Sequence, residues 1–241
     1  MIFDDDPTDW RELQDRVGQL FAELGCTVKV GETIELVRGN KEVDVLVHDP
    51  IPSPPAMYLV ECKFWNSPVP QEVVHSFRTI VADSGAHRGF IVSKAGFQAG
   101  ARKAIVKTNV DLYTFQELQA LFFSRWKVAI AEKYMPDTDR LFPFWDPSGG
   151  RRVPAHWGPE EIDKLNLLNS AYEPFLVLGP SSARSGYTLN CLPLTLPMLD
   201  ASFAVVGETV LSSYRQFYDF IEAHRDTALA RYEALFAERL G

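Results

Sequence analysis

The stretch MYLVECKFW, residues 57–65, has the pattern of an apolar β-strand with two charges, Glu61 and Lys63, in its middle. Taking an unpaired charge out of water costs on the order of several kcal/mol, so such groups are expected to be paired, metal-bound or exposed. Side chains alternate along a strand, so Glu61 and Lys63 share one face, about 7 Å apart along the strand, while Cys62 faces the core on the other side. The strand therefore presents an acid and a lysine together.

The preceding strand, EVDVLV at 42–47, also carries a lone acid, Asp44. If the two strands pair, Asp44 and Glu61 can converge on one divalent cation, and Mg²⁺ prefers one or two carboxylates plus water and phosphate oxygens. Lys63 would then stabilise charge on a phosphate, or orient and help deprotonate a water. The alternatives are an exposed Glu61–Lys63 pair on an edge strand and a turn-side role for Asp44.

The pattern around these strands predicts a mixed α/β sheet with helices on both sides. A helix begins at the Asp9 cap, and its inward face is expected to be Trp10, Leu13, Val17, Leu20, Phe21 and Leu24. Strands follow at 33–37, 42–47 and 58–64, with Gly39-Asn40 as a hairpin signal. Further elements are a helix at 71–83, a strand at 88–93, a helix at 97–107, a strand at 110–115 and a helix to about 131.

Beyond this domain, expected over residues 1–131, the sequence is less regular. Residues 132–160 are dense in Pro, Gly and Trp and are interpreted as a linker, and residues 161–241 as a smaller, mostly helical domain serving dimerisation or regulation. Within it we expect a helix at 159–171, β-like runs at 175–179 and 187–192, and an amphipathic stretch at 207–239. GPSSARSG, residues 179–186, lacks the GK[ST] ending of a phosphate-binding loop and is interpreted as a turn.

Asp44 followed by Glu61-Cys62-Lys63 has the form D…(D/E)xK, and on these residues the chain resembles the PD-(D/E)xK nucleases, in particular the Mrr-like restriction endonucleases. The resemblance covers about residues 8–120 and also rests on WRELQDRVGQLFAELGC and on VVHSFRTIVADSGAHRGFIVSKAGFQAGARKAI. It implies a restriction-endonuclease-like mixed sheet flanked by helices. Mrr-like proteins commonly carry Gln where Glu61 stands, so this chain departs from their pattern there.

The resemblance also implies an activity: cleavage of DNA phosphodiester bonds with Mg²⁺, or with Mn²⁺, in restriction or phage defence. Asp44 and Glu61 would bind the metal, Lys63 would be the catalytic lysine, and Glu12 would complete the site. Gln71 would lie near the site at the start of the next helix. For Glu12 a capping box with Asp9 is the competing interpretation, and for Gln71 ordinary helix-start chemistry.

Lys94, Arg102 and Lys103, together with Lys107, could follow a phosphate backbone, or could form a solvated helix face. The chain as a whole has a net charge of −8, which argues against binding DNA by bulk attraction, although residues 71–131 alone carry +4. RNA or branched DNA stays an alternative substrate, and a homodimer or an activating partner protein is compatible with the sequence. A different class of function is a catalytically silent binding module that acts through the C-terminal region.

The remaining bulk properties indicate a cytoplasmic protein. No apolar run is long enough to cross a bilayer, and the acidic start MIFDDDPTDW lacks the features of a signal peptide. Cys26, Cys62 and Cys191 are scattered without metal-ligand spacing, as expected for free thiols in a reducing compartment.

Overall fold

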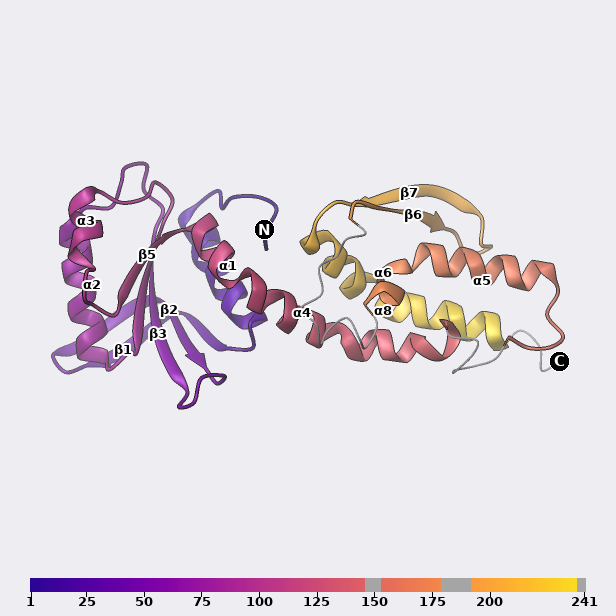
Figure 1. The fold of residues 1–241 in the computed structure, drawn as a ribbon, viewed down its shortest axis with the longest axis horizontal. Coiled ribbons are helices and arrows are strands. Elements are labelled where there is room, and N and C mark those ends of the chain that lie inside the picture. Colours follow the sequence, from indigo (N-terminus) through magenta and orange to yellow (C-terminus); the bar gives the residue numbers. More distant parts are fainter. Residues whose placement is uncertain (146–152, 179–191, 238–241) are drawn as a thin grey trace. The chain divides into compact units, whose positions relative to one another are not determined.

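The structure, a computed structural model, describes residues 1–145, 153–178 and 192–237. The chain divides into two compact units, Met1–Trp126 and Lys127–Gly241. The predicted fold class is confirmed: a five-stranded mixed sheet with flanking helices is followed by a largely helical region with a small hairpin (Figure 1). None of the described helices is long and apolar enough to span a membrane.

The first unit follows the predicted order of elements. It contains α1 (Trp10–Glu23), β1 (Thr27–Leu36), β2 (Gly39–Asp49), β3 (Ala56–Lys63), α2 (Gln71–Ser84), β4 (Arg88–Ser93), α3 (Ala99–Ala104), β5 (Val110–Thr114) and the first part of α4 (Phe115–Trp145). The sheet order is β1-β2-β3-β4-β5, antiparallel from β1 to β3 and parallel from β3 to β5. The predicted helix at 97–107 is shorter than expected.

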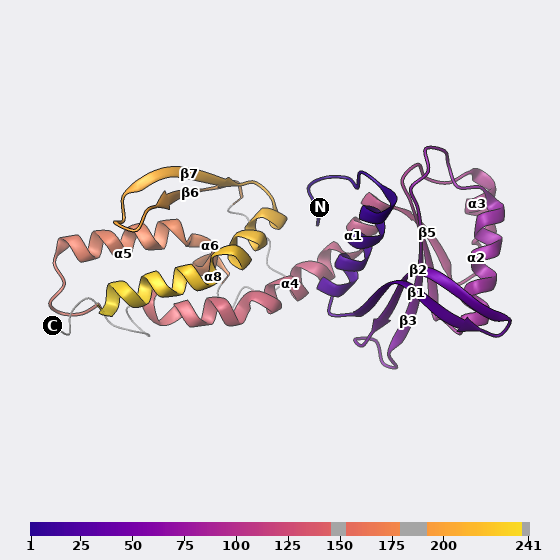
Figure 2. The ribbon, with the colours of Figure 1, turned by 180° about the vertical axis from the view of Figure 1, so that it is seen from behind.

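Two layers of helix cover this sheet. Figures 1 and 2 show α2 and α3 on one face and α1 with the start of α4 on the other. The α1 side is built on an aromatic cluster in which Phe21 packs against Tyr58, Phe90 and Phe122. The α2 side is aliphatic, with Leu59 of the central strand in its core. The parallel half of the sheet is therefore covered on both faces, as parallel strands require, whereas β1 has no fully buried residue.

Helix α1 shows how local signals define an element. Asp9 caps its N-terminus by accepting the Glu12 N–H, and Gly25 at φ 84° ends it in a conformation that glycine adopts without strain. The predicted apolar face is buried except at Trp10, which is 53% exposed, so the expectation for Trp10 was wrong. Trp10 is the first residue of the helix, and the Arg11 guanidinium lies over its ring.

The β1–β2 turn also differs from its prediction. Leu36 pairs with Gly39, so the two-residue loop is Val37-Arg38, and Gly39-Asn40 already belong to β2. Gly39 supplies the positive φ, 107°, directly after the loop. The hairpin signal was therefore genuine, but the turn lies two residues earlier than the Gly-Asn pair indicated.

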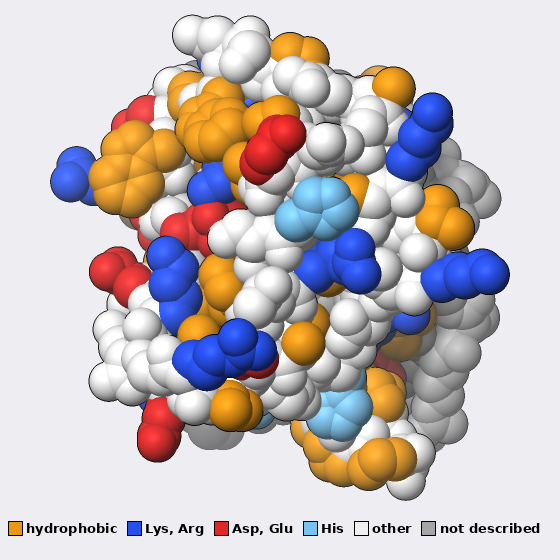
Figure 3. All heavy atoms as spheres, turned by 90° about the vertical axis from the view of Figure 1, so that its left-hand side faces the viewer, with side chains coloured by type: hydrophobic (Ala, Val, Ile, Leu, Met, Phe, Trp, Pro, Cys, Tyr) orange, Lys and Arg blue, Asp and Glu red, His pale blue; other side chains and the backbone are white. Residues whose placement is uncertain are grey.

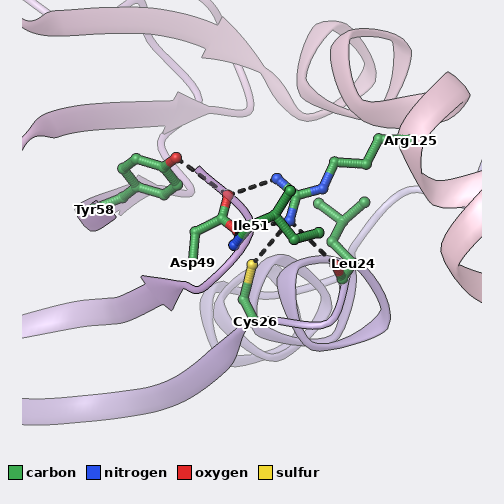
Figure 4. A network of polar contacts seen from close by, with 6 residues as sticks. All are labelled: Leu24, Cys26, Asp49, Ile51, Tyr58 and Arg125. Carbon is green, nitrogen blue, oxygen red and sulfur yellow. Dashed lines mark hydrogen bonds and ion pairs between the residues drawn. The ribbon is translucent and has the colours of Figure 1, made fainter. Parts of the chain in front are cut away.

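A buried ion pair fixes the first part of α4 to this unit (Figure 4). Arg125 donates to both carboxylate oxygens of Asp49, at 2.6 and 2.8 Å, and also to the Leu24 carbonyl oxygen and the Cys26 sulfur. The Asp49 side chain has 0% exposure and also accepts from the Tyr58 hydroxyl and the Ile51 N–H. Burial opposes its ionisation, but these hydrogen bonds prevail and hold the pKa of Asp49 below its usual value.

The second unit holds the rest of α4, with α5 (Pro159–Ala171), α6 (Glu173–Val177), the hairpin of β6 (Leu194–Leu199) and β7 (Val205–Leu211), and α8 (Tyr214–Ala237). The predicted helix at 159–171 is confirmed. Helix α4, expected to end near 131, continues to Trp145 through the start of the range interpreted as a linker.

The β-run expected at 175–179 is wrong, because its described part is helical, and the amphipathic stretch begins as a strand at 205–211. Residues 179–191, which include the expected strand start at 187 and the GPSSARSG turn, lie outside the described residues.

Candidate active site

The site begins where the ladder between β2 and β3 ends. The paired residues run from Asp49 opposite Ala56 to Val45 opposite Val60, so Asp44 and Glu61 come next on their strands. The Asp44 carboxylate accepts a hydrogen bond of 2.6 Å from the Cys62 backbone N–H. The predicted pairing of the two strands is thus present, and Asp44 is fixed against the backbone of the strand that carries Glu61 and Lys63.

The alternation along β3 assigns the charged side chains to one face. Tyr58 packs on the aromatic cluster below α1, whereas Leu59 belongs to the core below α2. Glu61 and Lys63 continue the series of Leu59 and therefore face α2. This matches the sequence prediction that the acid and the lysine share a face.

Glu61 and Lys63 form an ion pair, and each side chain retains 18% exposure. The Lys63 ammonium also lies over the Trp65 ring, 5.4 Å from its centroid. A cation beside an indole face is attracted by the ring quadrupole, which adds a second partner for the lysine. Both charges of the strand are therefore paired at the sheet end.

A cavity of about 350 Å³ opens beside this pair. Its lining comes from β2, β3 and α2: Lys41, Glu61, Lys63, Trp65, Glu72, Val73, Ser76, Phe77 and Ile80. Lys41 and Glu72 were not found by sequence reasoning. Glu72 carried a signal, since it lies in the first turn of the helix that follows β3. Lys41 carried none, because strand alternation assigns it to the face opposite Asp44.

The surroundings of Asp44 disfavour its ionised form. Burial is the main reason that the pKa of Asp44 lies above its ordinary value, and the neighbouring Glu61 carboxylate raises it further. The Cys62 N–H and the ammonium groups of Lys63 and Lys41 oppose these effects without cancelling them. An added cation beside Asp44 would offset both its burial and the charge of the neighbouring Glu61 carboxylate, so this is a natural place for one.

The donor set available for a metal consists of these two carboxylates. No group of three or more His, Cys, Asp or Glu side chains suited to a metal ion occurs in the described part of the chain. Mg²⁺ commonly takes one or two protein carboxylates and completes its octahedron with water and phosphate oxygens. Asp44 and Glu61 fit that pattern, and they do not fit a closed, all-protein site.

Glu12 makes its polar contacts at the start of α1. Its carboxylate accepts from the Thr8 N–H at 2.7 Å and the Thr8 hydroxyl at 2.6 Å, and it pairs with Arg16. These hydrogen bonds from Thr8, together with Arg16, lower the pKa of Glu12 to about 2. The predicted capping box therefore forms with one change, since Glu12 reaches Thr8 instead of the Asp9 backbone. Its role as a further metal ligand stays a prediction.

The predicted nucleic-acid contacts are distributed over several elements. Gln71 is exposed at the start of α2, where its side-chain oxygen lies against Gly100. Lys94 bonds Asn66 and lies over Phe64, in a hollow shared with Leu13 of α1. Arg102 and Lys103 are exposed on α3, with Arg102 over the Phe97 ring. Lys94 thus lies toward the α1 side, apart from the α2 side that Lys63 faces.

Residues 6–122 match the Mrr_cat family model, whose description is restriction endonuclease. This segment belongs to the Mrr_cat restriction endonuclease family. The matched range contains the whole D…(D/E)xK constellation and ends within α4, and it confirms the family resemblance of the sequence.

Two solved structures also resemble this chain. One is the crystal structure of a protein of unknown function, AF1548, with 17% identity and a TM-score of 0.41, covering 74% of this chain and 92% of that one. The other is the MspJI restriction endonuclease in complex with a 27-mer oligonucleotide, with 22% identity and a TM-score of 0.32, covering 48% and 28%. No curated protein matches the chain.

Proposed function

We propose that this chain is a Mg²⁺-dependent endonuclease that hydrolyses DNA phosphodiester bonds, with a role in restriction or phage defence. The observation that carries the proposal is the juxtaposition of Asp44 on β2 with Glu61 and Lys63 on β3, beside an open cavity. Membership of residues 6–122 in a restriction endonuclease family supports the same reaction class. Geometry and family therefore favour one chemistry.

In this proposal Asp44 and Glu61 hold the metal ion, with Mn²⁺ as a substitute. When bound, the ion would supply Lewis-acid stabilisation of charge on the phosphate and a lower pKa for a bound water. The chain fits such an ion because Asp44 and Glu61 follow the last paired residues of β2 and β3 on neighbouring strands, and the cavity there leaves room for water and phosphate to complete the coordination.

Lys63 is the residue that acts on the substrate. Its side chain lines the cavity, and its ammonium can donate to a non-bridging phosphate oxygen, where negative charge increases during attack by water. Trp65 and Glu61 restrict where that ammonium lies before substrate arrives. A pre-positioned donor needs little rearrangement in the transition state, which is the main source of electrostatic catalysis.

The decisive experiment is plasmid cleavage by purified protein with Mg²⁺ and with EDTA, comparing wild type, Lys63→Ala and Glu61→Ala. We expect metal-dependent nicking or linearisation, reduced at least about 100-fold in both variants. The matched control is Lys29→Ala, which removes an exposed lysine from a comparable lysine–glutamate pair with Glu32. Lys29→Ala should cut as wild type does, and circular dichroism should show that all variants are folded.

One observation favours a second function, a silent binding module. Lys63 is already paired with Glu61, and Asp44 already accepts from Cys62, so each of these three side chains has a partner without added ligands. Absence of cutting on duplex DNA, single-stranded DNA and RNA would support that module. Cutting that persists in Lys63→Ala would contradict the site assignment.

A further inference from the structure

A second hollow lies on the other side of α2 from the catalytic cavity. It measures about 690 Å³ and is lined by Arg38 from the β1–β2 turn, by His75, Arg78, Thr79, Ala82 and Asp83 of α2, and by Lys107, Thr108 and Asn109 from the loop before β5. Residues 72, 73, 76, 77 and 80 of the same helix line the catalytic cavity. With 3.6 residues per turn these two sets lie on different sides of α2. The helix therefore forms a wall between the two hollows.

The lining is rich in hydrogen-bond donors and in positive charge. Among the described residues that line it, Asp83 is the only acid, and Arg38 pairs with it at 3.4 Å. Arg78 and Lys107 then leave the hollow with a net positive charge within a chain of net charge −8. Ala82 is its only aliphatic side chain, whereas sites for small organic ligands are mostly apolar.

One basic side chain of the hollow is held by a hydrogen bond, and the backbone of another is strained. Arg78 donates to the Ala104 carbonyl oxygen at 3.1 Å, which restrains its guanidinium. Lys107 has a φ of 62°, a left-handed conformation that costs a non-glycine residue about 1 kcal/mol or more. Glycine is the favoured residue at such a position after a helix. This chain has a lysine there, so the lining of the hollow gains a positive charge at a cost in backbone strain.

We propose that this hollow, defined by Arg38, Arg78 and Lys107, binds the phosphodiester backbone of the DNA strand that enters the catalytic cavity. Arg, Lys, Thr and Asn side chains are the usual donors to DNA phosphates, and all four types line it. A helix with its side chains is about 10–12 Å across, which corresponds to roughly three base-pair rises along the axis of a duplex. Figure 3, which looks onto the side of the molecule where α2 and α3 lie, shows basic side chains with histidine among them.

This inference rests on the proposed DNA nuclease function, and it assigns contacts that the predicted set of Gln71, Lys94, Arg102 and Lys103 does not include. It explains how an acidic chain can hold a polyanion, since affinity for DNA depends on the local phosphate contacts more than on net charge. The hollow would then hold the DNA strand, while Asp44, Glu61 and Lys63 would cut it.

The test is binding of a fluorescein-labelled duplex, and of the matching single strand, in EDTA and over a range of salt concentrations. Lys107→Asn suits the left-handed backbone, and Arg78→Gln keeps an amide donor toward Ala104. Each should weaken binding and reduce the slope of log K against log salt by about 1. Lys29→Asn, the same charge change at an exposed position of β1, is the control and should bind as wild type does.

Three outcomes would overturn the assignment. The first is that Lys107→Asn and Arg78→Gln retain the wild-type slope, the second is that Lys29→Asn weakens binding equally, and the third is that folded wild type binds neither DNA. The proposed catalytic function is judged separately, by cleavage with Mg²⁺. If Lys107→Asn and Arg78→Gln weaken DNA binding as expected but the wild type does not cut DNA, this inference stands and the proposed nuclease activity is overturned.

Discussion

Asp44, the proposed metal ligand, also carries a cost to the stability of the fold. Its pKa is raised chiefly by burial and then by Glu61, which means that the folded state disfavours its ionised form. Asp44→Asn keeps an oxygen for the Cys62 N–H and removes the charge. At pH 7 we expect the free energy of unfolding to rise by about 1 kcal/mol while cleavage is lost. Urea denaturation and the plasmid assay measure the two effects.

The direction of the pKa shift of Asp44 determines how the stability difference between Asp44→Asn and wild type changes with pH. A folded-state pKa above the unfolded one means that ionisation destabilises the folded state, so protonation of Asp44 at lower pH relieves the cost. The advantage of Asp44→Asn should therefore shrink as the pH falls through the raised pKa. Asp111→Asn, which removes an acid from an exposed pair with Arg88, is the control. A less stable Asp44→Asn at pH 7 would mean that the contacts of the carboxylate outweigh its burial.

Glu12 should show the opposite behaviour. Hydrogen bonds from Thr8 lower its pKa to about 2, below its ordinary value near 4.5. A depressed folded-state pKa contributes stability that is present above the unfolded pKa and is lost as the pH falls toward about 2. Glu12→Gln should therefore flatten the loss of stability between about pH 4.5 and pH 2, measured as the urea midpoint against pH.

The same variant separates the two interpretations of Glu12. Cleavage by folded Glu12→Gln at the wild-type rate would leave it a helix-capping residue. Loss of cleavage with unchanged stability at pH 7 would favour the metal-ligand interpretation. Parallel pH profiles of wild type and variant would contradict the capping role.

At the scale of elements, α4 depends on the pair that joins it to the sheet. Arg125–Asp49 and Arg88–Asp111 have the same shortest N–O distance, 2.6 Å, yet Asp49 is fully buried and Asp111 is 30% exposed. Arg125→Ala would leave the Asp49 carboxylate buried without its cation, which costs about 3 kcal/mol, whereas Arg88→Ala should cost less than about 1 kcal/mol.

Chemical unfolding monitored by circular dichroism measures both costs. Hydrogen exchange should place the loss of protection in residues 1–126 for Arg125→Ala, because its partners belong to that unit. Equal costs for the two variants would contradict a decisive role for burial.

Elements of the first unit were predictable because their signals are local. Asp9 and Gly25 delimit α1, and the Thr114–Glu117 capping box begins α4 with reciprocal bonds of 2.7 and 3.2 Å. Errors arose where local signals are ambiguous. The apolar run at 175–178 fits a strand or a buried helix turn, and its residues 175–177 belong to α6. The β-branched residues of VVGETVL at 205–211 favoured a strand over the helical pattern that followed.

At the scale of the whole molecule, the features that depend on local signals were again predicted, and those that join distant segments were not. Asp44, Glu61 and Lys63 were predicted because alternation and one strand pairing suffice to bring them together. The Arg125–Asp49 pair was not, since its partners are 76 residues apart and Asp49 precedes a Pro-rich loop. The basic hollow beside α2 was not found either, because it joins residues from three separate segments. Contacts between distant segments are set by tertiary packing, and composition does not encode them.

The ion pair between Glu61 and Lys63 has one more consequence. The lysine already neutralises Glu61, so it acts as a resident counter-ion, and a divalent cation would compete with it for the same carboxylate. Occupancy by metal would rise once a phosphate draws the ammonium away, which makes substrate and metal binding mutually reinforcing. Removing the lysine should then tighten metal binding in the resting protein while it abolishes turnover, so affinity for the ion and catalytic competence would change in opposite directions.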